Sequence, residues 1–422
     1  MTTTDSFDPT AFDPFDADYL ADPYPLMNAA REFAPAFFNE RLGHWIVTRH
    51  ADIKQILRNP ARFSATNANS PLREPCPHAA KALVDGGYGA VPTLANVDPP
   101  AHTRVRRLAA TAFTNRRIAS MEPVIRQLVQ DFIRDHGPQG RADLVADLAW
   151  SLPAQVLFRV LGLGDENLET VKTGSWNRIL FVYGLPDDDT QVDAARGLAE
   201  FWTFIEALVH ERAESPRDDY ISALLAAETK DDGRLTEAEV ATVSLNLLFA
   251  GHETTTGLLG NGLRRLLEHE NAWDRLIEDP SRITNAIEEI LRFDSSVIAW
   301  RRQTTMDTQI GGVAVPKDAR LVLMLGAANR DPEVFENPDD FDIDRPNARE
   351  HLSFGHGPHL CLGAPLARLQ GRIALEELTA ALPELSLDQT CHYEFAPNIS
   401  FRGPLSLPAT WPPTTDHERD VG

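Results

Sequence analysis

The chain has 422 residues, 43% of them hydrophobic, which is enough to bury a large core. Its formal net charge of −22 argues against nucleic acid and anionic lipid as partners. The opening residues, MTTTDSFDPTAFDPFDADYL, contain neither a signal sequence nor a membrane-spanning segment, so we expect no export and no membrane insertion. The three cysteines are widely separated, which is typical of a reducing cytoplasm rather than of a disulfide framework: Cys76, Cys361 and Cys391.

The elements predicted along the first part of the chain are mainly helical. HWIVTRHADIKQIL, residues 44–57, predicts a short strand followed by a helix, and residues 64–100 predict a long irregular segment, functional or mobile. The pattern from residue 101 to about 267 is mostly helical, with one break at GLPDDD, residues 184–189. Within this region TEAE, residues 236–239, matches a capping box that begins a helix running to about residue 268.

The remaining elements predict minor β structure in a single domain. After another helix come two strand-like runs, residues 308–315 and 320–325, and then the proline-rich segment DPEVFENPDDFDIDRP. We therefore expect a mainly α fold with small β-sheets. Residues 1–14 are expected to form a flexible acidic arm, residues 15–412 one domain, and residues 413–422 a flexible tail.

The stretch FGHGPHLCLG, residues 354–363, places one cysteine among three glycines. Apolar residues at helical spacing follow it, so Cys361 should lie at a helix N-terminus, where the dipole and free N–H groups stabilise a thiolate. Glycines permit tight turns and close approach of a flat ligand, so the pattern favours an axial iron ligand. The alternatives are an inert buried cysteine and a zinc site formed with His351, His356 and His359.

The same stretch resembles the haem-ligand signature FxxGxxxCxG of the cytochrome P-450 haem-thiolate monooxygenases. It matches at all four fixed positions, Phe354, Gly357, Cys361 and Gly363. The resemblance implies the cytochrome P-450 fold, a triangular helical prism in which a long central helix crosses haem b. It also implies that Cys361 is the axial ligand of the haem iron, with Phe354, Gly355 and Gly363 beside the haem.

A second motif, AGHETT at residues 250–255, lies in the middle of the predicted long helix. A glycine and a carboxylate are both costly in an apolar helix, so each needs a reason. One explanation is structural: Thr254 can bond back to a carbonyl one turn earlier. The motif also resembles the family's oxygen-activation motif. That resemblance implies that Ala250 and Gly251 leave a groove for O₂ beside the haem, while Thr254 and Glu253 deliver protons.

Two further motifs resemble parts of the family that hold the haem region together. Glu289 and Arg292 in EEILRF form ExxR, either a surface ion pair or, with Arg345 of PDDFDIDR, the family's buried structural network. VDPPAHTRVRR, residues 97–107, resembles DPPxHxxxR. This resemblance implies a set of haem-propionate ligands in which Arg301 could replace its neighbour Arg302: His102, Arg106, Arg302 and His359.

The resemblance also implies a redox partner and a substrate pocket. No flavin or iron–sulfur module follows Trp411, so we expect electrons from a ferredoxin or flavodoxin with its reductase. Six arginines could form a positive patch for that partner: Arg104, Arg107, Arg116, Arg117, Arg368 and Arg372. The expected pocket is small and largely apolar, with no arginine or lysine that stands out for holding a carboxylate: Asn246, Phe249, Ala250, Val297 and Ile298.

Together these features predict a monomeric cytoplasmic monooxygenase of the soluble bacterial type. It should activate O₂ with electrons from NAD(P)H through partner proteins, and hydroxylate or oxidatively O-dealkylate a small aromatic or aliphatic substrate. One alternative is a haem-thiolate peroxygenase driven by H₂O₂, although relatives known for that chemistry replace the acid–Thr pair present here as Glu253 and Thr254. The other alternative is a non-enzymatic haem or gas sensor.

Overall fold

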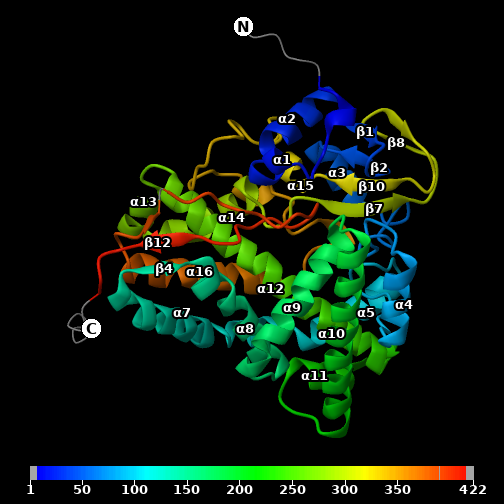
Figure 1. Cartoon of the computed structure of the whole chain (residues 1–422), viewed down its shortest axis with the longest axis horizontal. Coiled ribbons are helices and arrows are strands. Elements are labelled where there is room, and N and C mark those ends of the chain that lie inside the picture. Colours follow the sequence, from blue (N-terminus) through cyan, green and yellow to red (C-terminus); the bar gives the residue numbers. More distant parts are fainter. Residues whose placement is uncertain (1–6, 389, 415–422) are drawn as a thin grey trace.

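The computed structural model describes residues 7–388 and 390–414, and it confirms the mainly helical fold with small sheets. Figure 1 shows helix α12 in the middle of the molecule, with most of the strands and the N-terminal helices gathered at the top. The core is built largely from leucine, isoleucine, valine and phenylalanine side chains of the helices around α12.

Helix α12 (Glu237–Glu268) is the longest element and the axis of the fold. Its N-terminus has the predicted capping box, in which Thr236 Oγ1 accepts from the Glu239 N–H and the Thr236 N–H donates to the Glu239 carboxylate. Its 32 residues extend over about 48 Å. It packs against α8 (Ser151–Leu161), α10 (Asp188–Glu214), α14 (Ile283–Phe293) and α16 (Ala364–Ala381), so most of its faces are buried.

The other helices connect this core to the surface. In chain order they are α1 (Ala17–Ala21), α2 (Tyr24–Phe33), α3 (His50–Arg58), α4 (Pro77–Asp85), α5 (Ala101–Ala112), α6 (Asn115–Ala119), α7 (Glu122–His136), α9 (Leu168–Arg178), α11 (Tyr220–Ala226), α13 (Ala272–Glu278) and α15 (Leu325–Ala328). A run of π-helix, Ile179–Tyr183, continues α9 and ends at the predicted break before α10.

The largest sheet has five strands in the order β1 (Ala36–Asn39), β2 (His44–Val47), β10 (Arg320–Leu323), β7 (Trp300–Thr304) and β3 (Phe63–Ser64). Strands β10 and β2 are parallel, and the other pairs are antiparallel. Successive side chains of a strand point to opposite faces, so the neighbours Arg301 and Arg302 on β7 are directed to different sides of this sheet.

Three small sheets complete the fold. The predicted strand-like run at residues 308–315 is a hairpin of β8 (Thr308–Ile310) and β9 (Val313–Val315). Strand β12 (Pro408–Thr410) lies between β11 (Ser386–Leu387) and β4 (Arg141–Asp143), which ties the C-terminal segment to the region before α8. Strands β5 (Glu228–Thr229) and β6 (Gly233–Arg234) form a hairpin before α12.

The structure differs from the sequence expectations at both ends and in one loop. The packed chain begins before residue 15, because Phe12 is fully buried against Tyr19 and Phe37. At the other end the Thr414 N–H donates to the Gly137 carbonyl at 3.0 Å. The rest of the expected arm and tail, residues 1–6 and 415–422, lies outside the described residues. Residues 64–100 contain helix α4, whose first position is a proline.

One helical stretch, Leu144–Leu161, is long and apolar enough to cross a membrane by length and composition. About 67% of that stretch is buried inside the protein, against α12 and its neighbours. Its apolar character is therefore explained by its place in the core.

Candidate haem site

The cysteine loop presents one sulfur atom at the start of a helix. The Cys361 N–H donates to the Phe354 carbonyl at 2.9 Å, and α16 begins three residues later. The Cys361 side chain is exposed, but it faces an enclosed space, and burial therefore raises the pKa of the thiol. Hydrogen bonds from the Gly363 and Ala364 N–H groups and the nearby guanidinium groups act in the opposite direction without reversing the shift. A cation bound to the sulfur would supply the missing stabilisation of a thiolate.

The glycines around Cys361 leave the sulfur accessible. Gly355 and Gly357 both have φ of +71°, a left-handed conformation that other residues rarely adopt. A Cβ atom built on Gly357 would lie 2.6 Å from the Leu57 carbonyl oxygen, so this turn also requires close approach to α3. A Cβ on Gly363 would meet only the Cys361 sulfur, at 3.8 Å. The loop is thus close-packed behind the sulfur and open in front of it.

The centre of α12 is a second place where residues of the core are accessible. Ala250 is exposed, and Gly251, Glu253 and Thr254 are partly exposed, although residues 240–245 of the same helix are buried. An exposed alanine in the middle of a buried helix indicates an internal cavity. The Thr254 hydroxyl donates to the Ala250 carbonyl at 2.5 Å, which is the structural bond expected for this residue.

Residue His252 links the acid of this motif to the protein core. His252 is fully buried, its Nε2 lies 3.0 Å from the Trp150 carbonyl oxygen, and its Nδ1 lies 3.3 Å from the Glu253 carboxylate. The side chain of Glu253 is therefore positioned beside the cavity by its neighbour in the sequence. Sequence reasoning assigned no role to His252, because the motif allows any residue there.

A cluster of nitrogen donors without partners lies where haem propionates are expected. The rings of His102 and His359 are 4.0 Å apart, and neither nitrogen of His102 nor Nε2 of His359 has a hydrogen-bond partner in the described part of the chain. His359 Nδ1 is 3.1 Å from the Leu94 carbonyl oxygen. Arg302 is buried with no carboxylate in ion-pair range among the described residues, and burial lowers its pKa to about 10 against the nearby charge of Asp98. This donor set is complementary to two carboxylates.

The two remaining candidates for binding a propionate are Arg106 and Arg301. Burial lowers the pKa of Arg106, while the neighbouring Cys361 raises it, so this guanidinium lies beside the cysteine. Arg301 is directed to the other face of β7, where its Nη2 donates to the Ala68 carbonyl at 3.0 Å and the guanidinium lies over the Tyr183 ring. The geometry therefore favours Arg302 over Arg301 as a propionate ligand. Together with the accessible sulfur, the residues present fit a haem.

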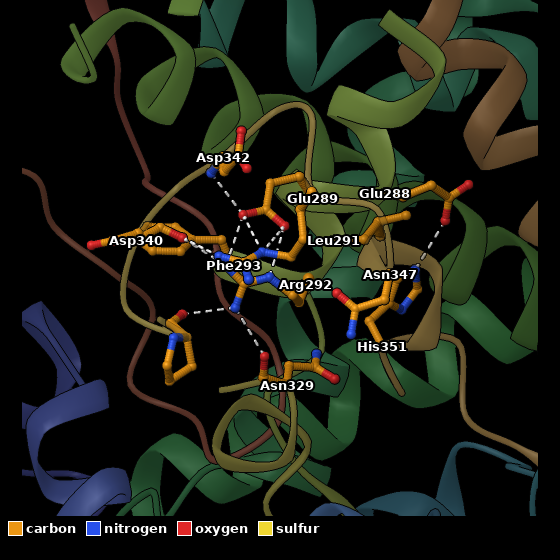
Figure 2. A network of polar contacts seen from close by, with 12 residues as sticks. Glu288, Glu289, Leu291, Arg292, Phe293, Asn329, Asp340, Asp342, Asn347 and His351 are labelled. Carbon is orange, nitrogen blue, oxygen red and sulfur yellow. Dashed lines mark hydrogen bonds and ion pairs between the residues drawn. The ribbon is translucent and has the colours of Figure 1, made fainter. Parts of the chain in front are cut away.

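Glu289, Arg292 and Arg345 form one buried network, of which Figure 2 shows Glu289 and Arg292 with their partners. Arg292 donates twice to the Glu289 carboxylate, at 2.7 Å each, and Arg345 Nε donates to the same carboxylate at 3.3 Å. The remaining Arg292 donors reach the main-chain carbonyls of residues 329, 338 and 340. The network thus joins α14 to the irregular segment that leads into the cysteine loop.

A second buried carboxylate, Glu288, was not recognised from the sequence. It accepts two hydrogen bonds from Arg368, at 2.7 and 2.9 Å, and lies 3.1 Å from His351 Nε2. Burial raises the pKa of Glu288, but the hydrogen bonds from His351 and Arg368 lower it by a larger amount, so the pKa is about 2. Arg368 in turn lies over the Phe354 ring, 4.6 Å from its centroid. The feature of the sequence that could have revealed Glu288 is the pair of adjacent glutamates in EEILRF.

The histidines of the alternative zinc site do not converge. His351 contacts Glu288, His356 Nε2 accepts from Arg58, and His359 lies beside His102. Within residues 7–388 and 390–414, no group of three or more potential metal ligands lies together. The arrangement favours an iron ligand at Cys361 over a zinc site.

Most members of the expected positive patch are paired with carboxylates, which reduces the charge that the patch can offer a partner. Arg104 pairs with Glu239, Arg107 with Asp232, Arg117 with Asp218, Arg368 with Glu288, and Arg372 with Glu122 and Glu376. In the described part of the chain only Arg116 of this set is exposed without an ion pair. The carboxylates cancel much of the charge because a chain this acidic supplies partners for surface arginines.

The expected pocket residues lie together but are less apolar than predicted. Phe249 is buried and stacked on Tyr183, with ring centroids 6.0 Å apart, and Phe401 packs edge-on against both rings. Val297 bridges to Phe401, and the Ile298 N–H donates to the Ser400 carbonyl at 2.8 Å. These contacts form an aromatic wall beside the exposed Ala250.

An arginine lies at this wall, contrary to the sequence expectation. Arg178 is buried, its Nη2 donates to the Asn246 side-chain oxygen at 2.7 Å, and its guanidinium lies 4.8 Å from the Phe249 ring centroid. It belongs to the aromatic stretch WNRILFVY, residues 176–183. The signal that could have revealed it is Asn246 itself, because a polar side chain in an apolar helix requires a partner.

Comparison with known proteins agrees with this geometry. The Cytochrome P-450 family model matches residues 46–380. The chain is 38% identical over 369 residues to erythromycin C-12 hydroxylase of Saccharopolyspora erythraea, covering 86% of this chain and 88% of that protein. It is 35% identical over 374 residues to vitamin D(3) 25-hydroxylase of Pseudonocardia autotrophica, covering 87% and 88%.

A solved structure confirms the fold. It is cytochrome P-450 CREJ in complex with (4-ethylphenyl) dihydrogen phosphate, similar to this structure with a TM-score of 0.92 and 39% sequence identity over 96% of this chain and 100% of that one. The matched relatives are hydroxylases, which are oxidoreductases. With the accessible cysteine at the start of α16 and the opened centre of α12, these matches show that the chain belongs to the cytochrome P-450 family of haem-thiolate monooxygenases.

Proposed function

We propose that this protein is an O₂-dependent monooxygenase that binds haem b through Cys361 and receives electrons from a separate ferredoxin or flavodoxin with its reductase. The observation that carries the proposal is the pairing of two exposed features in an otherwise buried core. These are the Cys361 side chain at the start of α16 and the Ala250 surface in the middle of α12. A flat cofactor between them would have its iron at the sulfur and its open side at α12.

When bound, haem supplies the chemistry of reductive O₂ activation and insertion of one oxygen atom into a substrate bond. The protein residues hold and orient it. His102 and His359 bind the propionates with ring nitrogens that otherwise have no partner among the described residues, and Arg302 binds them with a buried guanidinium that no carboxylate there neutralises. Thr254 places a hydroxyl at the cavity, and Glu253, held by His252, supplies a carboxylate that can pass protons inward from its partly exposed position.

The proposed substrate is a small organic molecule with an aromatic ring, which is hydroxylated or O-dealkylated. The partly exposed Phe401, backed by the buried rings of Phe249 and Tyr183, supports this, because an aromatic ring offers a surface on which another ring can pack. The structural neighbour CREJ binds a 4-ethylphenyl compound, which is consistent with a ring of that size.

The proposed partner would dock near the cysteine loop, where a groove of about 560 Å³ is lined by residues including Arg349, Arg368 and Arg372. All three of these arginines are paired with carboxylates, so their charge is reduced but not removed. We further propose a cytoplasmic monomer. The free thiols of Cys76, Cys361 and Cys391 are consistent with a reducing compartment.

The test is the absorption spectrum of the reduced, carbon monoxide-bound holoprotein. We expect the red-shifted Soret band that is characteristic of thiolate ligation. Cys361→Ser should abolish this band, whereas the control Cys391→Ser should retain it, because Cys391 lies outside the site. Freshly prepared, haem-replete wild-type protein without the band would refute the proposal.

Turnover measurements distinguish the proposed monooxygenase from the alternative, a peroxygenase driven by H₂O₂. We expect faster product formation with NAD(P)H, ferredoxin and reductase than with H₂O₂, because Glu253 and Thr254 are both present at the cavity. The reverse order would favour a peroxygenase. Haem binding without turnover in either assay would favour a sensor.

A further inference from the structure

Arg178 is a buried cation without a counter-charge. It is 5% exposed, and no carboxylate lies within ion-pair distance of it in the described part of the chain. Burying an unpaired guanidinium is costly, and three other buried arginines of this protein avoid that cost through an ion pair. Arg212 pairs with Asp219, Arg292 with Glu289, and Arg402 with Asp294.

The contacts that Arg178 does make leave part of its guanidinium unused. Asn246 accepts from Nη2, and the face of Phe249 offers a cation–π contact. Nε is buried and has no hydrogen-bond partner among the described residues. The hydroxyl of Ser175, one turn earlier on α9, is also fully buried and without a partner there. An anion at this point would satisfy the charge and the free donor together.

The position of Arg178 relates it to the cavity of the proposed monooxygenase. Its partner Asn246 lies one turn before the exposed Ala250 on α12. Asn246 Nδ2 donates to Thr93 Oγ1 at 3.2 Å, and the next residue, Leu94, contacts His359 of the cysteine loop through its carbonyl. The segment 93–94 thus connects Asn246 to the cysteine loop, and Arg178 contacts this connection through Asn246.

Two other buried arginines border this region, and both have other roles. Arg302 belongs to the proposed propionate set. Arg301 Nη2 donates to the main-chain carbonyls of Ala68 and Val182, at 3.0 and 3.4 Å, so it joins two loop segments. Nε of Arg301 is also buried and without a partner among the described residues, but of the three arginines only Arg178 donates to a side chain of α12, that of Asn246.

We propose that Arg178 is a specificity-determining residue that binds the anionic group of the substrate. This inference rests on the proposed monooxygenase function and names its substrate class: a para-substituted alkyl-aromatic anion, with a carboxylate or phosphate at one end. Arg178 contacts Asn246. Along α12, Asn246 lies one to two helical turns, or about 5–11 Å, from the groove at Ala250 and Thr254. A substrate of this class would extend from Arg178 along α12, with its alkyl end at the groove.

The test measures binding to the holoprotein by calorimetry and by the substrate-induced Soret shift. The probes share one hydrocarbon part: 4-ethylbenzoate, 4-ethylphenyl phosphate and the neutral 4-ethylanisole. Wild-type protein should bind an anionic probe at least tenfold more tightly than the neutral one, and the tighter of the two anions identifies the headgroup. Arg178→Gln should weaken anion binding about 10- to 100-fold and change neutral binding by less than about threefold.

Asn246→Asp provides an independent variant of similar size. A carboxylate at this position would pair with Arg178 and should displace the anionic probes while the neutral probe still binds. The matched control Arg134→Gln removes a half-exposed arginine of α7 and should change nothing. Equal losses for anionic and neutral probes in both Arg178→Gln and Asn246→Asp would overturn the inference, as would a wild-type protein without preference for anions.

The carbon monoxide spectrum of each variant separates this inference from the proposed function. A normal band in wild-type protein without anion preference refutes only the role of Arg178. A missing band in wild-type protein refutes the proposed function itself. If Arg178→Gln fails to bind haem, Asn246→Asp carries the test, because it preserves the guanidinium.

Discussion

Replacing Arg292 by alanine should lower the melting temperature and the haem content of the purified protein. Arg292 and Glu289 are both fully buried, and Arg292 makes five hydrogen bonds, two to Glu289 and three to main-chain carbonyls. The alanine variant leaves Glu289 with Arg345 and the Asp342 N–H as its remaining partners, and leaves three carbonyls without this donor. Breaking a buried pair in this way costs about 3 to 5 kcal/mol.

The expected shift follows from the size of the chain. An unfolding entropy of about 2.1 cal/mol/K per residue amounts to about 0.9 kcal/mol/K for 422 residues. A loss of 3 to 5 kcal/mol therefore corresponds to about 3 to 6 °C, measured by circular dichroism on heating. Haem content, measured as the ratio of Soret to protein absorbance, should fall as well, because the network joins α14 to the segment before the cysteine loop.

Two variants make this result interpretable. Arg275→Ala removes a half-exposed pair with Asp344 and should shift the melting temperature by about 1 °C or less. Arg292→Lys keeps the charge but cannot form the bidentate contact, so it should fall between wild type and alanine. The reasoning would be refuted if Arg292→Ala melted within about 1 °C of wild type and retained its haem.

The remaining predictions concern pH and proton delivery. Burial lowers the pKa of His44 to about 4, so between pH 6.5 and 4 the unfolded state binds more protons and stability is lost as the pH falls. Over that window wild type should lose about 3 °C more in melting temperature than His44→Gln, and parallel curves would contradict this. Thr254→Ala should lower product formed per NAD(P)H at least about tenfold. Thr203→Ala, which removes the same kind of bond to a carbonyl one turn earlier on α10, should leave the yield unchanged. Unchanged turnover in Thr254→Ala would count against the proton-delivery role.

Much of the fold could be predicted from local patterns. The capping box at Thr236 and the break before residue 188 were recognised because the groups that satisfy them lie within a few residues. Helix α4 was missed because a short helix within a region rich in proline and glycine has too few turns to show a clear period. Phe12 was assigned to a flexible arm because its partners, Tyr19 and Phe37, become neighbours only in the folded chain.

The features of the site also divide into those that the sequence predicts and those that only the folded structure reveals. The sequence by itself determined the cysteine, the opened helix centre and the ExxR pair, because each is a short motif whose spacing carries the chemistry. Only the tertiary structure decided the electrostatics. Arg104 is neutralised by Glu239, 135 residues away, Glu288 holds Arg368 from another helix, and Arg178 meets Asn246 across 68 residues. Buried charges are decided by partners that packing brings together from distant parts of the chain, and no local pattern encodes that choice.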